Sequence, residues 1–188
     1  MTPLGEVIII RALSDGFVEI AGPSATAQLL ALKNLFFRYG AKRLLTDGAI
    51  NRRSLSSPKV SDAAILCAGA SLNRDMSVVV KETAHIANLL SLKENHDVKI
   101  PPPGKILCFN EDGLIPVFEQ DIMDGTCIKK HKHITRLAVG GALTDTLMQK
   151  LLASGSRAGQ LEITVEDGSK ALLSRKAYER FQSLGGKI

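Results

Sequence analysis

The chain has 188 residues, of which 45% are hydrophobic and 23% charged, and its formal net charge is +5. This length allows one domain with a sizeable core, and the composition is that of a globular chain. The charge is too diffuse to indicate nucleic-acid binding, and aromatic residues, at 4% with no Trp, are too few for base-stacking platforms. Apolar runs stay below the ~18 residues that span a bilayer, and the N-terminus lacks a signal-peptide pattern, so no membrane association is predicted.

The N-terminal part predicts two strands and a helix. Residues 6–13 and 17–21 are β-branched or alternating runs separated by a Ser-Asp-Gly turn, which is typical of neighbouring strands. Residues 24–39 follow with leucines at helical spacing. Ser24 is placed to cap the start of this helix and Gly40 to end it.

The middle of the chain predicts two further strands, a helix and a connector. Residues 42–47 and 63–68 are short apolar runs on either side of a polar loop. A second helix is expected over residues 73–91, where apolar residues again keep helical spacing. Residues 93–104 are charged and then carry three consecutive prolines, which favour a stiff, irregular connector.

The C-terminal part predicts a hairpin followed by alternating strands and helices. Residues 105–109 and 114–118 flank an Asn-Glu-Asp-Gly turn, which is a hairpin signal. The remaining predicted elements are a strand over 135–143, a helix over 144–154, a strand over 161–166 and a helix over 174–184.

Strands that alternate with helices are typical of βα units. We therefore predict a single α/β domain over residues 1–188, with three layers and a mainly parallel, Rossmann-like sheet covered by helices on both faces. Neither GxxxxGK[ST] nor GxGxxG occurs, so the fold has no Walker A loop and no dinucleotide fingerprint. Both ends of the sequence are abrupt, and we expect a piece of a longer polypeptide, the alternative being a short protein with tidy ends.

Three segments share one design, in which an apolar strand leads through small residues into a helix that opens with Ser, Thr or Asn. They contain Gly22 with Ser24, Gly69 with Ser71, and the Gly-Gly pair of residues 137–148. Helix N-termini offer unpaired N–H groups to phosphate or carboxylate, and such turns gather at the carboxyl ends of parallel strands. The alternative is that the small residues only allow close packing and the hydroxyl residues are plain caps.

Asp47 ends the predicted strand 42–47, and Gly48 and a loop with Arg52 and Arg53 follow it. An acid at a strand end can hold Mg²⁺, and arginines can bind phosphate or carboxylate oxygens in a fork. Asp47 could instead cap a turn, with the arginines solvated or bound to helix C-termini. The predicted ligand-binding residues are Gly22, Ser24, Asp47, Gly48, Arg52, Arg53, Gly69 and Ser71, with Asp47 as the metal ligand.

No catalytic residue is predicted, because no Ser/His/Asp or Cys/His arrangement is evident in the sequence. His131 and His133 alternate with lysines, which disfavours metal binding, and His85 is interpreted as packed within its helix. Asp75 and Asp145 each stand at the start of a predicted helix, and for both a capping role and a functional role stay open.

The cysteines, Cys67, Cys108 and Cys127, are odd in number and form no CxxC pair. Two of them lie in apolar runs, so we expect buried thiols in a reducing compartment, which predicts a cytoplasmic protein.

Four short motifs in the first half of the chain are distinctive as a set. They are TPLGE at 2–6, AGPS at 21–24, DGA at 47–49 with Arg52 and Ser54 after it, and AGAS at 68–71. Together they resemble a subunit of the reactivating factor for lysine 5,6-aminomutase of lysine-fermenting bacteria. From residue 101 onward the α/β style continues without a sharp motif.

The resemblance implies a chaperone-like, ATP-dependent factor. Such factors release damaged cobalamin from a radical mutase so that fresh adenosylcobalamin can enter, and they act with a larger, MutS-like ATPase partner. ATP and Mg²⁺ are the implied ligands, whereas adenosylcobalamin belongs to the client aminomutase. Because the chain lacks a Walker A loop, ATP could bind at the partner subunit. A homo-oligomer is left open.

A second hypothesis rests on the residues alone. A stand-alone enzyme could act on a phosphorylated or carboxylated small molecule, with Asp47 as metal ligand or base. The lack of a nucleophile–base arrangement in the sequence favours the accessory factor over this enzyme.

Overall fold

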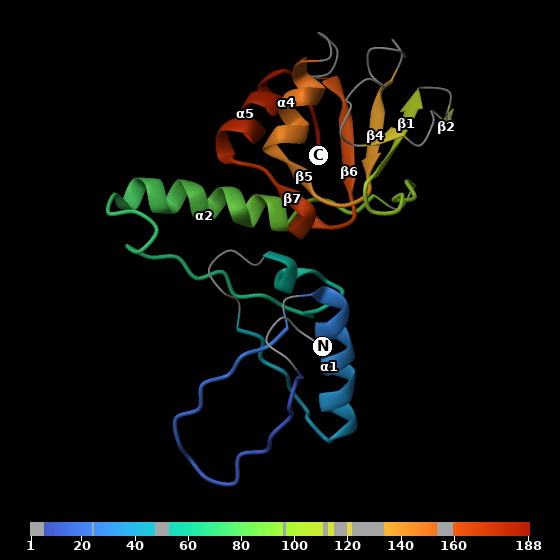
Figure 1. Cartoon of the computed structure of the whole chain (residues 1–188). Coiled ribbons are helices and arrows are strands. Elements are labelled where there is room, and N and C mark those ends of the chain that lie inside the picture. Colours follow the sequence, from blue (N-terminus) through green and yellow to red (C-terminus); the bar gives the residue numbers. More distant parts are fainter. Residues whose placement is uncertain are drawn as a thin grey trace. The chain divides into compact units, whose positions relative to one another are not determined.

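The chain forms two compact units, Met1–Asp62 and Ala63–Ile188, and each is described here by itself. A computed structural model (Figure 1) describes residues 6–23, 25–47, 53–95, 97–110, 113–114, 120–121, 134–153 and 160–188.

The first unit contains α1 (Thr26–Arg38) and a short 3-10 helix, η1 (Arg53–Ser56). The predicted helix over 24–39 is thus confirmed, although its N-cap is Ala25, which makes no side-chain capping bond. The helix stops at Gly40, whose φ of 88° lies in the left-handed region that glycine adopts without strain.

Lys33 connects α1 to the end of the first unit. Its Nζ donates a hydrogen bond of 3.0 Å to the carbonyl oxygen of Val60 and lies 3.5 Å from Oδ1 of Asp62. Val60 itself is buried. The lysine therefore fixes the segment after η1 against α1 by an exposed ion pair and one backbone contact.

Four predicted strands are absent from the described residues: 6–13, 17–21 and 42–47 in the first unit, and 63–68 in the second. These runs form neither a helix nor a strand ladder in the structure. Within the described part of the chain, no backbone hydrogen bond joins residues 6–23 to another residue. Sequence pattern alone does not make a strand, because a strand also needs a neighbour that accepts and donates its backbone hydrogen bonds.

Within its described residues, the second unit has three α-helices at the predicted places. They are α2 (Met76–Leu90), α4 (Asp145–Ala153) and α5 (Arg175–Ser183), and a 3-10 helix, η3 (Gly168–Lys170), precedes α5. The predictions of helices over 73–91, 144–154 and 174–184 are therefore confirmed.

The sheet of the second unit is mixed. Its central strand β1 (Lys105–Asn110) pairs antiparallel with β2 (Gly113–Leu114), with β3 (Gln120–Asp121) and with β4 (Arg136–Val139). β6 (Glu162–Val165) then pairs parallel with β4. A separate two-stranded parallel sheet joins β5 (Leu143–Thr144) to β7 (Ala171–Leu172). The antiparallel pairing of β1 with β2 confirms the predicted hairpin turn after Asn110.

Side chains alternate between the two faces of this sheet, as the pleat requires. Cys108 and Leu137 point into a core that includes Leu147 and Met148 of α4 and Phe181 of α5. Figure 1 shows α4 and α5 together on that side of the sheet. The opposite face carries a smaller cluster of Val98, Phe109 and Ala138, with Ile100 and Leu107 against it.

The predicted three-layer, mainly parallel, Rossmann-like sheet with helices on both faces is therefore wrong. The sheet is small and mixed, because β1 enters it through antiparallel pairs. Only one face carries helices, because the second face is covered by Val98 and Ile100 of the irregular segment before β1. The predicted strand over 135–143 is also two strands, β4 and β5, which belong to different sheets.

Candidate functional site

Of the predicted ligand residues of the first unit that the structure describes, Gly22 and Asp47 lie exposed. Gly22 is exposed, and a Cβ built on it would meet nothing within 4 Å. Asp47 is also exposed, whereas Arg53 begins η1 and is partly buried. Ser24, Gly48 and Arg52 lie outside the described residues.

The turn at Gly69 and Ser71 belongs to the second unit and does not lead directly into a helix. The N–H of Leu72 donates to the carbonyl oxygen of Gly69 at 3.0 Å, which closes a turn before α2 begins at Met76. Gly69 and Ser71 are exposed, and Gly69 has open space at its Cβ position. That these residues converge with Gly22 and Asp47 on one ligand stays a prediction.

The N-terminus of α2 already has an acidic cap. Oδ1 of Asp75 accepts a hydrogen bond of 2.8 Å from the N–H of Ser77, and Oδ1 of Asn73 accepts one of 2.8 Å from the N–H of Asp75. Hydrogen bonds from the side chain and the backbone of Ser77 lower the pKa of the Asp75 carboxyl. Of the two roles left open for Asp75, the capping role is confirmed, and its negative charge opposes an external anion at this helix end.

The third turn, at Gly140 and Gly141, is filled by the protein itself. The N–H of Gly104 donates to the carbonyl oxygen of Gly140 at 2.8 Å, and the N–H of Gly140 donates to that of Lys105 at 2.9 Å. A Cβ on Gly140 would collide with the carbonyl oxygen of Pro102. Gly141 has a φ of 114°, which a residue with a side chain rarely adopts. Close backbone packing therefore explains these glycines.

The residues after this turn serve local structure. Oγ1 of Thr144 accepts a hydrogen bond of 3.3 Å from the N–H of Leu147 in the first turn of α4. Oδ1 of Asp145 accepts one of 2.7 Å from the N–H of Ser174, the N-cap of α5. Of the two roles left open for Asp145, capping its own helix is taken by Thr144, and Asp145 instead binds the backbone before α5.

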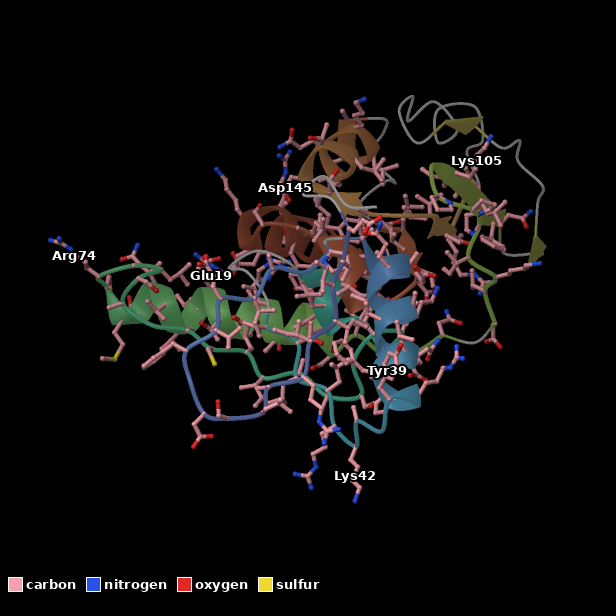
Figure 2. All side chains as sticks on the ribbon, turned by 60° about the horizontal axis from the view of Figure 1, so that its bottom comes forward. Glu19, Tyr39, Lys42, Arg74, Lys105 and Asp145 are labelled. Atoms are coloured by element: carbon pink, nitrogen blue, oxygen red, sulfur yellow. The ribbon has the colours of Figure 1, made fainter. Side chains whose placement is uncertain are left out.

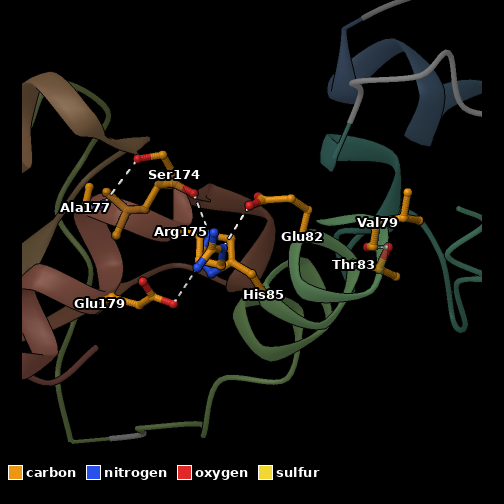
Figure 3. A network of polar contacts seen from close by, with 9 residues as sticks. Val79, Glu82, Thr83, His85, Ser174, Arg175, Ala177 and Glu179 are labelled. Atoms are coloured by element: carbon orange, nitrogen blue, oxygen red, sulfur yellow. Dashed lines mark hydrogen bonds and ion pairs between the residues drawn. The ribbon is translucent and has the colours of Figure 1, made fainter. Parts of the chain in front are cut away.

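A polar network that the sequence does not indicate joins α2 to α5 (Figure 3). Nε of Arg175 donates to Oε1 of Glu82 at 2.8 Å, and its Nη1 reaches Oε1 of Glu179 at 3.0 Å. The hydrogen bond to Glu82, then that to Glu179, raise the pKa of the Arg175 guanidinium. Because two carboxylates bind its guanidinium, Arg175 links α2 to α5 and does not offer an open anion site.

His85 lies beside this network and is buried. Its Nε2 is 2.9 Å from the carbonyl oxygen of Leu173, and its ring centroid is 5.4 Å from that of Tyr178. The same face of α2 approaches η3 so closely that a Cβ on Gly168 would collide with the carbonyl oxygen of Leu89. The interpretation of His85 as a packed histidine is confirmed. No signal in the sequence could pair Glu82 with Arg175, because they lie 93 positions apart.

The cysteine predictions divide. Cys108 is buried, as predicted, whereas Cys67 is exposed. Cys67 lies in the run 63–68, which was expected to be a buried strand and is extended and exposed instead. His96, Cys127, His131 and His133 lie outside the described residues.

Within the described ranges, no group of three or more His, Cys, Asp or Glu side chains is arranged to hold a metal ion. No helix among the described residues is both long and apolar enough to cross a membrane. No protein-family model, curated protein or solved structure matches the chain.

Proposed function

We propose that the chain is an accessory, chaperone-like factor for an adenosylcobalamin-dependent aminomutase. It would promote the ATP-linked exchange of damaged cobalamin together with a partner ATPase subunit in the cytoplasm. The observation that carries this proposal is the set of motifs at 2–6, 21–24, 47–49 and 68–71, which resembles a subunit of the lysine 5,6-aminomutase reactivating factor.

Exposed apolar side chains on the first unit support a role in which the chain binds other proteins. Ile8, Leu13, Phe17 and Ile20 are 80%, 93%, 111% and 86% exposed. Large apolar side chains gathered in one exposed stretch typically mark a protein-binding surface. An accessory factor needs such surfaces, because it acts on a mutase that holds the cobalamin.

The nucleotide is assigned to the partner subunit or to the residues around Asp47. The chain has no Walker A loop, which favours the partner. If ATP and Mg²⁺ bind this chain, Asp47 is the metal ligand, and Arg52 and Arg53 contact the phosphates.

A reconstituted exchange reaction tests the proposal. The aminomutase is first allowed to inactivate, so that it holds damaged cobalamin. We then add the 188-residue chain, the partner ATPase, ATP, Mg²⁺ and adenosylcobalamin. We expect release of the damaged cofactor, followed by its absorbance, and recovery of mutase activity only when chain and ATP are both present. A matched reaction without the chain is the control.

Recovery at the same rate without the chain would reject the proposal. The enzyme hypothesis makes a different prediction, since Asp47→Asn would then abolish turnover of a phosphorylated or carboxylated small molecule in the absence of any mutase.

A further inference from the structure

Residues 6–21, which form no helix or strand, expose most of their large apolar side chains to solvent; we call this segment the acidic arm. Ile8 and Ile10 are 80% and 68% exposed. The arm carries three carboxylates and one arginine, so its charge is negative although the whole chain has a net charge of +5. Its exposed large apolar side chains are Val7, Ile8, Ile10, Leu13, Phe17, Val18 and Ile20.

The backbone of the acidic arm is ready for strand pairing. It forms no helix or strand and bends at Leu13 and Ser14, and none of its N–H or C=O groups bonds to another described residue. Unpaired strand backbone adds readily to another strand. A continuous apolar run such as residues 7–10 is typical of a strand that is buried on both faces.

A second exposed segment of the same unit has the opposite charge. Residues 38–46 follow from the end of α1 and include Arg38, Lys42 and Arg43, all exposed; we call them the basic segment. Tyr39 and Leu45 add apolar surface, with exposed fractions of 73% and 95%. Figure 2 shows Tyr39 and Lys42 near each other, with Lys42 directed away from the ribbon.

The charges of the two segments are unused within one chain. Among the described residues, Glu6 and Glu19 of the arm and Lys42 and Arg43 of the basic segment form no ion pair. Residues 42–47 likewise form no helix or strand and make no backbone hydrogen bond with a described residue. Both segments thus offer unpaired backbone and exposed apolar side chains, and they carry opposite charges.

We propose that two copies of the chain associate by reciprocal strand pairing, in which the acidic arm of each copy binds the basic segment of the other. A twofold arrangement makes this contact twice. In each copy, seven apolar side chains of the arm and two of the basic segment would become covered. Each would bury roughly 60 to 120 Å² of apolar surface. The sum is close to the ~800 Å² per partner that a stable interface needs.

Charge exchange between the two segments tests the pairing, with light scattering and sedimentation of the full 188-residue chain as the measurement. One variant carries Glu6→Lys and Glu19→Lys, and the other carries Lys42→Glu and Arg43→Glu. All four side chains are exposed, so far-ultraviolet circular dichroism should stay that of the wild type.

We expect the wild type to dimerise and each variant alone to lose at least about tenfold in dimer affinity, because like charges then face each other. An equimolar mixture of the two variants should regain wild-type affinity, since every contact in the mixed dimer is again between opposite charges. The control Lys81→Glu with Lys176→Glu lowers the net charge by the same amount as Lys42→Glu with Arg43→Glu, but on exposed parts of α2 and α5, and it should dimerise normally.

Three results would overturn the proposal: a wild type that stays monomeric at every concentration, variants that dimerise as well as the wild type, or a mixture that remains monomeric. The first result would indicate that the segments pair within one chain or bind a different protein.

Discussion

Two β-branched runs of this chain, one around Ile163 and one around Ile8, differ in burial and in backbone pairing. Ile163 lies in β6, is 1% exposed and pairs in register with Leu137 of β4. Ile8 lies in an equally β-branched run and is 80% exposed, without a strand partner among the described residues. Their intrinsic strand propensity is the same, so the difference comes from the neighbours that each run finds.

Both edges of β6 are hydrogen-bonded, and its apolar face is covered. On one edge β6 pairs with β4, and on the other the N–H of Ile163 donates to the carbonyl oxygen of Lys187 at 2.8 Å. Leu151 of α4 and Phe181 of α5 are part of the core that covers Ile163. A strand thus becomes stable when its edges and its apolar face are satisfied at the same time.

The largest expected effect comes from shortening these two isoleucines. Ile163→Ala should lower the free energy of unfolding by about 2 to 5 kcal/mol, because it removes buried methyl groups and leaves a cavity. Ile8→Ala should change it by no more than about 0.5 kcal/mol, since the side chain is already in water. Urea unfolding followed by circular dichroism measures both, because the chain has no Trp for fluorescence.

The measurement is made at a protein concentration where sedimentation shows single copies, so that self-association does not contribute. Equal destabilisation by both substitutions would break the comparison, since it would mean that residues 6–13 are packed in solution as tightly as β6.

The same comparison explains which elements could be predicted from the sequence. Helices were predicted well because their main signal, the spacing of apolar residues, is local. The strands of residues 6–13 and 63–68 could not be judged locally, because pairing depends on distant residues. The sheet is mixed because β1 pairs antiparallel with β4, and the alternation of strands and helices in the sequence did not indicate this pairing.

The candidate site shows the same limit. The turns at Gly22, Gly69 and Gly140 look alike in the sequence, and each was considered a place for an anion. The structure distinguishes them by what lies next to each glycine: Pro102 at Gly140, and open space at the other two. Pro102 was recognised only as part of a connector, and nothing in the sequence indicates that it touches this turn.

A smaller effect is expected from adding a methyl group to the turns. Gly140→Ala should destabilise the second unit by about 1 to 3 kcal/mol, because its Cβ would collide with backbone at Pro102 that cannot rotate away. Gly69→Ala, in the same unit, is the matched control and should stay within about 0.5 kcal/mol. Thermal and urea unfolding of both variants measure the difference.

If Gly140→Ala is as stable as the wild type, the proline segment does not rest on this turn in solution. The turn at the end of β4 would then be open, and its glycines would again be candidates for ligand binding.

The smallest expected effect concerns the exposed cap of α2 and depends on pH. The pKa of Asp75 is lowered from its ordinary value in the folded chain, first by the hydrogen bond from the Ser77 side chain and then by that from its backbone N–H. The folded state therefore holds the Asp75 proton less tightly than the unfolded state. The stabilising contribution of the Asp75 carboxylate is complete above the ordinary carboxyl pKa and is lost as pH falls through the lower folded value.

Asp75→Asn keeps an oxygen acceptor without the charge. The excess stability of the wild type over this variant should therefore shrink to nothing in acid, as measured by melting temperature across pH. Ser77→Ala removes only the side-chain donor and should leave a weaker dependence on pH. A difference between wild type and Asp75→Asn that stays constant with pH would show that the carboxylate's charge contributes nothing at this helix end.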